Sequence, residues 1–252
     1  MVALLVTNIV LVTVVVVTGR DFVLEDIGGV FEQANVIAEY AAERLTAAAN
    51  GEALPDPPAI LADLFLVKVG ISVTIAYQAA LIFIVVLLSR KPARELFREL
   101  KLHRLDAETF WRPALVTLGA YVLLIVYSVI VSAIGPDILQ PESTVPVEVV
   151  RDDFAIILTG VAALIGAPLA EEMFFRVLLF GGLLRWGFWP AALISSLLFA
   201  GVHLDPGSLV PFTLIGVLLA WLFWRRGHLW DAITFHLMFN ATSFILLVSL
   251  GR

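Results

Sequence analysis

The chain has no cysteine among its 252 residues, and this absence removes several kinds of chemistry at once. Disulfides, thiol nucleophiles and thiolate metal sites are all excluded. Charge is also scarce, because Asp, Glu, Lys and Arg make up 15% of the chain, whereas a soluble domain carries about 25%. Hydrophobic residues reach 60%. This composition predicts an integral membrane protein that crosses the bilayer several times.

Several familiar functional motifs are missing as well. No basic stretch interleaved with aromatic residues indicates a nucleic-acid partner. None of the four histidines begins the H-E-x-x-H motif of zinc proteases, and no G-x-S-x-G motif of serine hydrolases occurs. A hydrolase of this composition would have to activate water with a carboxylate and an imidazole.

Apolar segments long enough to cross a bilayer recur along the chain, since a spanning helix needs about 20 apolar residues. They predict an all-α polytopic membrane bundle of about seven transmembrane helices. The predicted spans are Val2–Thr18, Leu61–Leu88, Pro113–Ile134, a helix from Phe154 to about Leu184, Trp189–His203, Leu209–Trp224 and Leu229–Leu250. The fifth would rise only about 22 Å at 1.5 Å per residue, less than a hydrocarbon core of about 30 Å.

The charges of the connecting segments predict an orientation in the cell membrane. Seven basic residues crowd the connector after the second span, which indicates a cytoplasmic position by the positive-inside rule. They are Arg90, Lys91, Arg94, Arg98, Lys101, Arg104 and Arg112. The acidic loop 135–153 is then outside. Counting spans places the amino terminus in the cytoplasm and the carboxyl terminus outside. Because no positive region precedes Val2–Thr18, we expect a retained helix rather than a signal peptide.

Residues 19–58 differ in character from the spans on either side. Apolar residues recur there at helical spacing, with Leu45 on the apolar face and Arg44 on the polar one. We therefore expect an extracytoplasmic insertion containing an amphipathic helix, ended by the prolines at 55–58. Residues 1–252 are predicted to form a single membrane domain, with residues 154–250 as the catalytic core helices.

Three ionisable residues interrupt the fourth apolar segment. A charge at bilayer depth costs several kcal/mol, so such residues are usually functional. Glu172 and Arg176 are four residues apart and can pair on one helix face, whereas Glu171 is rotated by about 100° from Glu172. The nearby Pro168 is expected to free a backbone carbonyl and kink the turn. The pattern predicts a supporting ion pair beside a carboxylate free for chemistry; the alternative is a purely structural pair.

Further polar residues stand in apolar surroundings on two later helices. Phe199 and His203 lie four residues apart, as do His236 and Asn240. Each pair projects from one face of its helix. We expect the histidines, the asparagine and Glu171 to share one site, where donors from His236 and Asn240 stabilise an oxyanion. Alternatively, the glutamate and two histidines would hold Zn²⁺ as a His₂Glu set.

This ordered set resembles the CPBP intramembrane protease family, also called the ABI or type II CAAX prenyl protease family. The matching residues are Glu171, Glu172, Arg176, Phe199, His203, His236 and Asn240. The resemblance covers residues 167–244 and each motif is complete. It implies a glutamate-dependent endopeptidase that works in a membrane cavity without a metal cofactor. Its substrate would be a peptide or a lipidated peptide.

Roles follow from the resemblance by motif. Glu171 would activate the attacking water together with His203. His236 and Asn240 would bind the oxyanion, and the remaining three matching residues would support them. Because the glutamates follow the outer loop by most of a helix length, we expect the cavity to open toward the cytoplasm.

Other functions remain open at this point. The fold could serve as a non-catalytic membrane scaffold or a bacteriocin-immunity protein, or the protease could depend on zinc. A transporter could use the carboxylates as a proton relay. A transporter often shows internal repeats, and none is detectable here. A scaffold would be expected to lose a motif residue, and none is lost.

Overall fold

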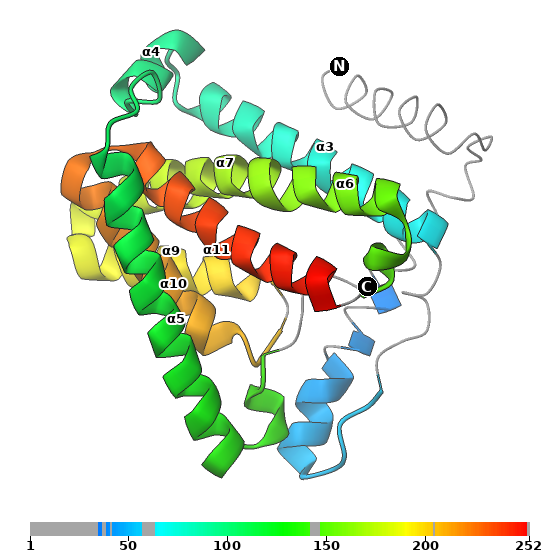
Figure 1. The fold of residues 1–252 in the computed structure, drawn as a ribbon. Coiled ribbons are helices and arrows are strands. Elements are labelled where there is room, and N and C mark those ends of the chain that lie inside the picture. Colours follow the sequence, from blue (N-terminus) through cyan, green and yellow to red (C-terminus); the bar gives the residue numbers. More distant parts are fainter. Residues whose placement is uncertain are drawn as a thin grey trace.

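The computed structural model describes residues 35–36, 39–40, 42–56, 64–141, 147–203 and 205–250. The predicted first span, Val2–Thr18, and most of the predicted amphipathic segment lie outside these ranges. The described part of the chain is built from helices and turns (Figure 1).

Most of the described chain lies in long helices. They are α3 (Leu64–Leu88), α5 (Glu108–Ile134), α10 (Leu209–Arg226) and α11 (Leu229–Leu250). A helical rod from Asp153 to Trp186 joins α6 (Asp153–Val161), α7 (Ala167–Glu171) and α8 (Gly181–Leu183). Two π-helical stretches, Ala162–Gly166 and Glu172–Phe180, and a final 3₁₀ turn, Leu184–Trp186, complete the rod. Shorter pieces are α4 (Ala93–Glu99), α9 (Phe188–Gly201), and the 3₁₀ turns Asp137–Leu139 and Val147–Arg151.

The lengths of these helices confirm a polytopic helical membrane bundle. In the described ranges, five helices are long and apolar enough to cross a membrane: α3, the rod, α5, α10 and α11. The helix α9 has only 14 residues, so it rises about 21 Å, as its sequence predicted. Five spans and one short helix correspond to the predicted spans two to seven.

The rod lies at the centre of this arrangement. It packs against α3 along α6 and α7, and against α11 at its first π-helical stretch and α7. The helix α5 leans on α11, and α9 and α10 pair closely with each other (Figure 1). The segment that carries the glutamates is therefore enclosed by helices on several sides.

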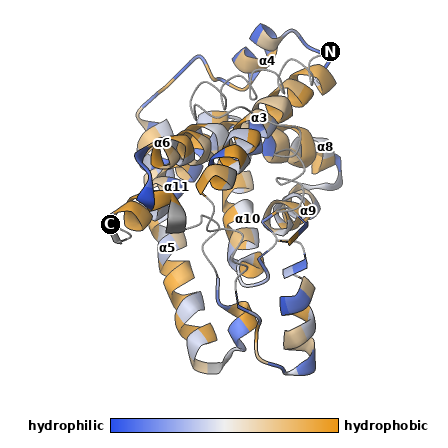
Figure 2. Ribbon diagram, turned by 90° about the vertical axis from the view of Figure 1, so that its right-hand side faces the viewer, coloured by the Kyte–Doolittle hydropathy of each residue, from blue (hydrophilic) through white to orange (hydrophobic). Residues whose placement is uncertain are grey.

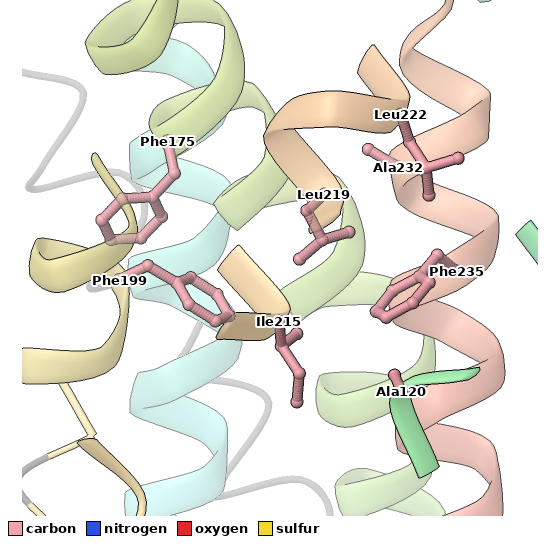
Figure 3. Close-up of a cluster of buried hydrophobic side chains, with 8 residues drawn as sticks. All are labelled: Ala120, Phe175, Phe199, Ile215, Leu219, Leu222, Ala232 and Phe235. Atoms are coloured by element: carbon pink, nitrogen blue, oxygen red, sulfur yellow. The ribbon is translucent and has the colours of Figure 1, made fainter. Parts of the chain in front are cut away.

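An aromatic cluster joins the rod to α9, α10 and α11 (Figure 3). The rings of Phe175 and Phe199 meet edge to face, with their centroids 5.4 Å apart. Ile215, Leu219 and Phe235 complete the cluster and are almost fully buried. Aromatic pairs of this geometry contribute about 0.5–1.5 kcal/mol beyond the area they bury. This packing holds α9 at the level of the glutamates.

The basic connector docks on the start of α11. The backbone N–H of Leu229 donates to Leu100 O, and the indole N–H of Trp230 donates to Leu102 O. Arg226 forms ion pairs with Asp106 and Asp231. The residues predicted to be cytoplasmic thus gather at one end of the bundle, where hydrophilic residues are concentrated on α4 (Figure 2).

The opposite end is formed by the turn at residues 205–208 and the loop after α5. The hydroxyl of Tyr127 donates to Leu139 O and to Gly207 O, which holds the two segments together. At the same end, the Asp152 carboxylate caps α6 by accepting from the Ala155 N–H, and it pairs with Lys68 of α3 at 2.6 Å. The hydrogen bond from Lys68 holds the pKa of Asp152 below its ordinary value.

The helix at residues 42–50 packs with its predicted polar face inward. Arg44 is only 3% exposed, and its guanidinium pairs with Asp205 at 3.3 Å, whereas Leu45 is 53% exposed. The predicted amphipathic facing is therefore wrong for these residues. Its physical cause is the carboxylate of Asp205, which stabilises an inward arginine that apolar periodicity assigns to the surface. This contact places the helix at the end away from the basic connector.

The close packing of α9 and α10 generates a first prediction. A Cβ on Gly216 would lie 2.7–2.9 Å from Ser196 atoms, one of them backbone. We expect Gly216→Ala to push the two helices apart and lower stability by about 1–3 kcal/mol. Thermal unfolding in detergent measures this loss. Gly119→Ala in α5 is the control, because nothing lies within 4 Å of a Cβ there; equal melting temperatures for the two variants would contradict the prediction.

Candidate active site

Three charged or titratable side chains interlock at the centre of the rod. One oxygen of Glu172 accepts from Arg176 Nε at 2.8 Å, and the other bonds Nδ1 of His236 at 2.9 Å. Glu172 and Arg176 are fully buried. The predicted ion pair is present, but Glu172 also bonds His236, which the sequence spacing did not indicate. Because a carboxylate oxygen accepts, Nδ1 of His236 carries the proton.

Glu171 points away from this interlocked group into a cavity. Its side chain is 21% exposed, and Oε2 lies 3.9 Å from Nε2 of His236, beyond hydrogen-bond distance. Oε2 is itself buried and has no hydrogen-bond partner among the described residues. The predicted pairing of Glu172 is therefore present, and Glu171 differs from it in having an oxygen without a described partner, whereas its role in chemistry stays a prediction.

The ring of His203 is oriented by its own helix. Its Nδ1 lies 2.9 Å from the carbonyl oxygen of Phe199, one turn earlier. A carbonyl can only accept, so Nδ1–H donates and Nε2 of the neutral ring keeps a lone pair. Nε2 is the ring nitrogen left for chemistry.

The Phe199 ring connects the charged pair to both histidines. Its centroid lies 5.2 Å from the ring of His203 and 5.9 Å from the ring of His236. The guanidinium carbon of Arg176 lies over the same ring at 5.1 Å, a cation–π contact that suits a guanidinium whose Nη1 and Nη2 have no hydrogen-bond partner among the described residues. One aromatic side chain thus fixes the relative positions of three site residues. The short α9 is what brings His203 to the level of His236.

Asn240 bonds the rod about two turns before the glutamates. Its amide Nδ2 donates to Ala163 O at 2.8 Å. The backbone there is π-helical, with the N–H of Ala167 bonding Ala162 O. The next donor in that pattern would come from Pro168, which has no N–H. Asn240 therefore supplies the donor that the proline removes, and the freed carbonyl predicted from Pro168 is present.

Gln78 of α3 is a site residue that the sequence analysis missed. It is 5% exposed, lines the same cavity and donates from Nε2 to Ala162 O at 3.2 Å. A signal was available in the sequence, because Gln78 is the single carboxamide in the 25-residue apolar helix α3. A buried polar group within a membrane span indicates a functional position, just as a charge does.

The cavity has a volume of about 650 Å³ and contains the predicted constellation. Glu171, His203, His236 and Asn240 all line it. Such a volume falls in the range of small-molecule and peptide pockets, about 300–1,000 Å³. No direct hydrogen bond joins Glu171 to His203 in the described part of the chain, so a water-mediated link between them stays a prediction.

The alternative zinc site can be compared with this geometry. In the described ranges, no three His, Asp or Glu side chains are close enough together to form a metal-binding group. The expectation of a metal-free mechanism stays a prediction.

The cavity lies toward the end of the bundle opposite the basic connector. Its exposed lining residues are Thr74, Ser128, Pro141 and Ser243. Thr74 is in the first half of α3, and Ser128 and Ser243 are in the last parts of α5 and α11. The predicted opening toward the basic connector is therefore wrong. The rod from Asp153 to Trp186 has 34 residues, far more than the roughly 20 needed to span, so counting from the outer loop overestimated depth.

Two comparisons with known proteins find similar sequences. Residues 153–242 match the model of the type II CAAX prenyl endopeptidase Rce1-like family. A stretch of 97 residues is 36% identical to a Bacillus subtilis (strain 168) protein with the printed name "Putative membrane peptidase YdiL". The region that matches the Rce1-like family contains all the residues predicted for the site, from Glu171 to Asn240. The alignment covers 38% of this chain and 39% of that relative, so it spans about two-fifths of the relative's length.

The match to the Rce1-like family begins at α6 and ends within α11. It leaves α3, with Gln78, and the helix at residues 42–50 outside. No solved structure matches the chain.

The interlocked charges generate a second prediction. Glu172→Gln keeps the shape of the side chain but leaves the Arg176 charge buried without its counter-charge. We expect a loss of about 3–5 kcal/mol in stability. Thermal unfolding of the purified protein measures it. Glu99→Gln is the matched control, because it removes a partner of the exposed pair Lys91–Glu99, whose effect should stay below about 1 kcal/mol. A Glu172→Gln melting temperature equal to that of the control would show that the pair is dispensable.

Proposed function

We propose that this protein is an intramembrane endopeptidase that hydrolyses a peptide bond with water activated by Glu171. The observation that carries the proposal is the contrast between two adjacent glutamates. Glu172 is saturated by Arg176 and His236, whereas Glu171 presents a carboxylate oxygen without a described partner to a cavity. That cavity also holds an imidazole with a bare nitrogen and a second imidazole.

The proposed reaction has two steps. Glu171 takes a proton from water, and the hydroxide oxygen adds to the scissile carbonyl carbon, so that the carbonyl electron pair moves to oxygen. The oxyanion then re-forms the carbonyl, the C–N bond breaks, and Glu171 returns the proton to the leaving amine. His203 accepts a hydrogen bond from the same water at Nε2. General acid–base catalysis of this kind contributes about 10²–10⁴-fold.

In this scheme, His236 and Asn240 bind the oxyanion. Nδ1–H of His236 is already bonded to Glu172, so donation to an oxyanion from Nε2 requires the imidazolium form. The Asn240 amide has two N–H bonds and uses one on Ala163 O. The second can reach the oxyanion from the same wall.

The substrate class follows from the surroundings of the cavity. It lies among apolar helices that span the membrane, so the cleaved segment must partition into the bilayer. A lipidated carboxyl-terminal peptide and a transmembrane peptide both meet this condition. The match to a prenyl endopeptidase family favours the lipidated peptide as the first probe. A non-catalytic scaffold would keep the fold and cleave neither.

Activity supplies the third prediction. Purified protein in proteoliposomes is incubated with a farnesylated carboxyl-terminal peptide and with a library of transmembrane peptides. We expect Glu171→Gln to lower kcat by at least about 10²-fold, because the proton acceptor is lost. Its melting temperature should fall less than that of Glu172→Gln, since Glu171 has no direct hydrogen bond to a described residue and Nε2 of His236 lies 3.9 Å away.

Three results would overturn this proposal in different ways. Retained turnover in Glu171→Gln would remove the glutamate mechanism. Loss of activity with a chelator, restored by Zn²⁺, would establish the zinc-dependent alternative. Absence of cleavage of every peptide by the folded, unmodified protein would support the scaffold.

The side of the membrane from which substrate enters supplies the fourth prediction. If the basic connector is cytoplasmic, as predicted, the cavity opens to the outside. In this cysteine-free chain, Ser243→Cys on the cavity wall should react with an impermeant maleimide on intact cells. Arg94→Cys on α4 should react only after permeabilisation. The reverse labelling pattern would place the cavity on the cytoplasmic side.

A further inference from the structure

Two carboxamides donate hydrogen bonds to successive backbone carbonyls in the part of the rod that precedes Glu171. Gln78 of α3 donates to Ala162 O and Asn240 of α11 donates to Ala163 O, at 3.2 and 2.8 Å. Both side chains line the cavity. They approach the rod from different helices and meet at its first π-helical stretch, Ala162–Gly166.

The backbone at this stretch needs such partners. A π-helical turn is less regular than an α-helical one and is seen mostly as short bulges near functional sites. Here Pro168 removes the donor that would follow Ala167. In a membrane, each buried carbonyl without a donor is costly. Asn240 supplies the donor that Pro168 removes at Ala163 O, whereas Gln78 adds a second donor to Ala162 O, which also accepts from the N–H of Ala167.

The contact with Gln78 is also shaped to fit. Its Oε1 lies so close to Gly166 that a Cβ at position 166 would overlap it. Oε1 is buried and has no hydrogen-bond partner among the described residues. The Gln78 amide can lie here only because position 166 is a glycine, since the Cβ of any other residue would overlap Oε1. Gln78 and Gly166 thus act as a matched pair.

We propose that Gln78 is a positioning residue for Glu171. By fixing the π-helical turn from α3, it sets the rotation of α7 and hence the direction of the carboxylate. Gln78 lies outside residues 153–242, so this chain's α3 completes a site whose other residues lie within the family match. The effect on turnover rests on the proposed function, whereas the effect on the turn does not.

The test uses Gln78→Met, which keeps length and removes the amide. Gln78→Asn is a second variant that stays polar but is too short to reach Ala162. Hydrogen exchange by mass spectrometry should show residues 162–171 exchanging several-fold to about tenfold faster in both, as expected for one lost hydrogen bond. Kinetics with the peptide cleaved in the screen above should show a lower kcat at unchanged KM.

Two controls separate positioning from packing. Ser72→Ala removes another buried polar group of α3, whose hydroxyl donates to Lys68 O of its own helix and has no other hydrogen bond among the described residues; exchange and kcat should not change. Gly166→Ala should destabilise the protein through its overlap with Gln78. Adding Gln78→Ala should restore the melting temperature by making room, but it should leave kcat low.

Four outcomes would overturn the assignment. Unchanged exchange at residues 162–171 would show that the amide does not hold the turn. Faster exchange with unchanged kcat would show that the turn does not position Glu171. A raised KM with unchanged kcat would make Gln78 a substrate-binding residue instead. Recovery of kcat in the Gly166→Ala, Gln78→Ala double variant would show that Gln78 acts only through packing. If no peptide is cleaved, the exchange result still decides whether Gln78 holds the turn.

Discussion

The fully buried contact of Glu172 with Arg176 and His236 is the constraint on which the rest of the site depends. A buried carboxylate is tolerated only with compensating partners, and here one comes from its own helix and one from α11. The bond to His236 fixes the rotation of α11 relative to the rod. It thereby also places Asn240, one turn later on α11, against the carbonyl before Pro168. One ionised group therefore positions two helices.

Apolar contacts fix the position of α9 relative to the rod. Phe199 packs against Phe175 of the rod and contacts the guanidinium of Arg176 through its face. Its backbone carbonyl holds the ring of His203. Catalysis by the proposed mechanism would thus depend on residues that take no part in the reaction themselves, because they orient the residues that do.

Local spacing predicted what lies on a single helix. The pairing of Glu172 with Arg176 follows from their four-residue separation, and the length of α9 follows from its apolar run. Contacts between helices could not be derived in this way. The bond from His236 to Glu172, the inward Arg44 and the side on which the cavity opens all depend on how helices rotate and tilt against one another. Gln78 carries no charge, so the cost of burying an ion does not single it out in the sequence. An amide at that depth nevertheless needs a hydrogen-bond partner, just as a charge does.

The shortness of α9 also affects the surrounding lipid. Its outer face is apolar, with Leu193, Ile194, Leu197 and Leu198 each 40–50% exposed. A helix of 14 residues covers about 21 Å of a hydrocarbon layer about 30 Å thick. The bilayer must thin beside α9 or tilt its acyl chains to match it, at a modest cost per ångström. Headgroups and water are then drawn inward beside α9, whose end lies two residues before His203, so that polar groups approach the cavity from the lipid side.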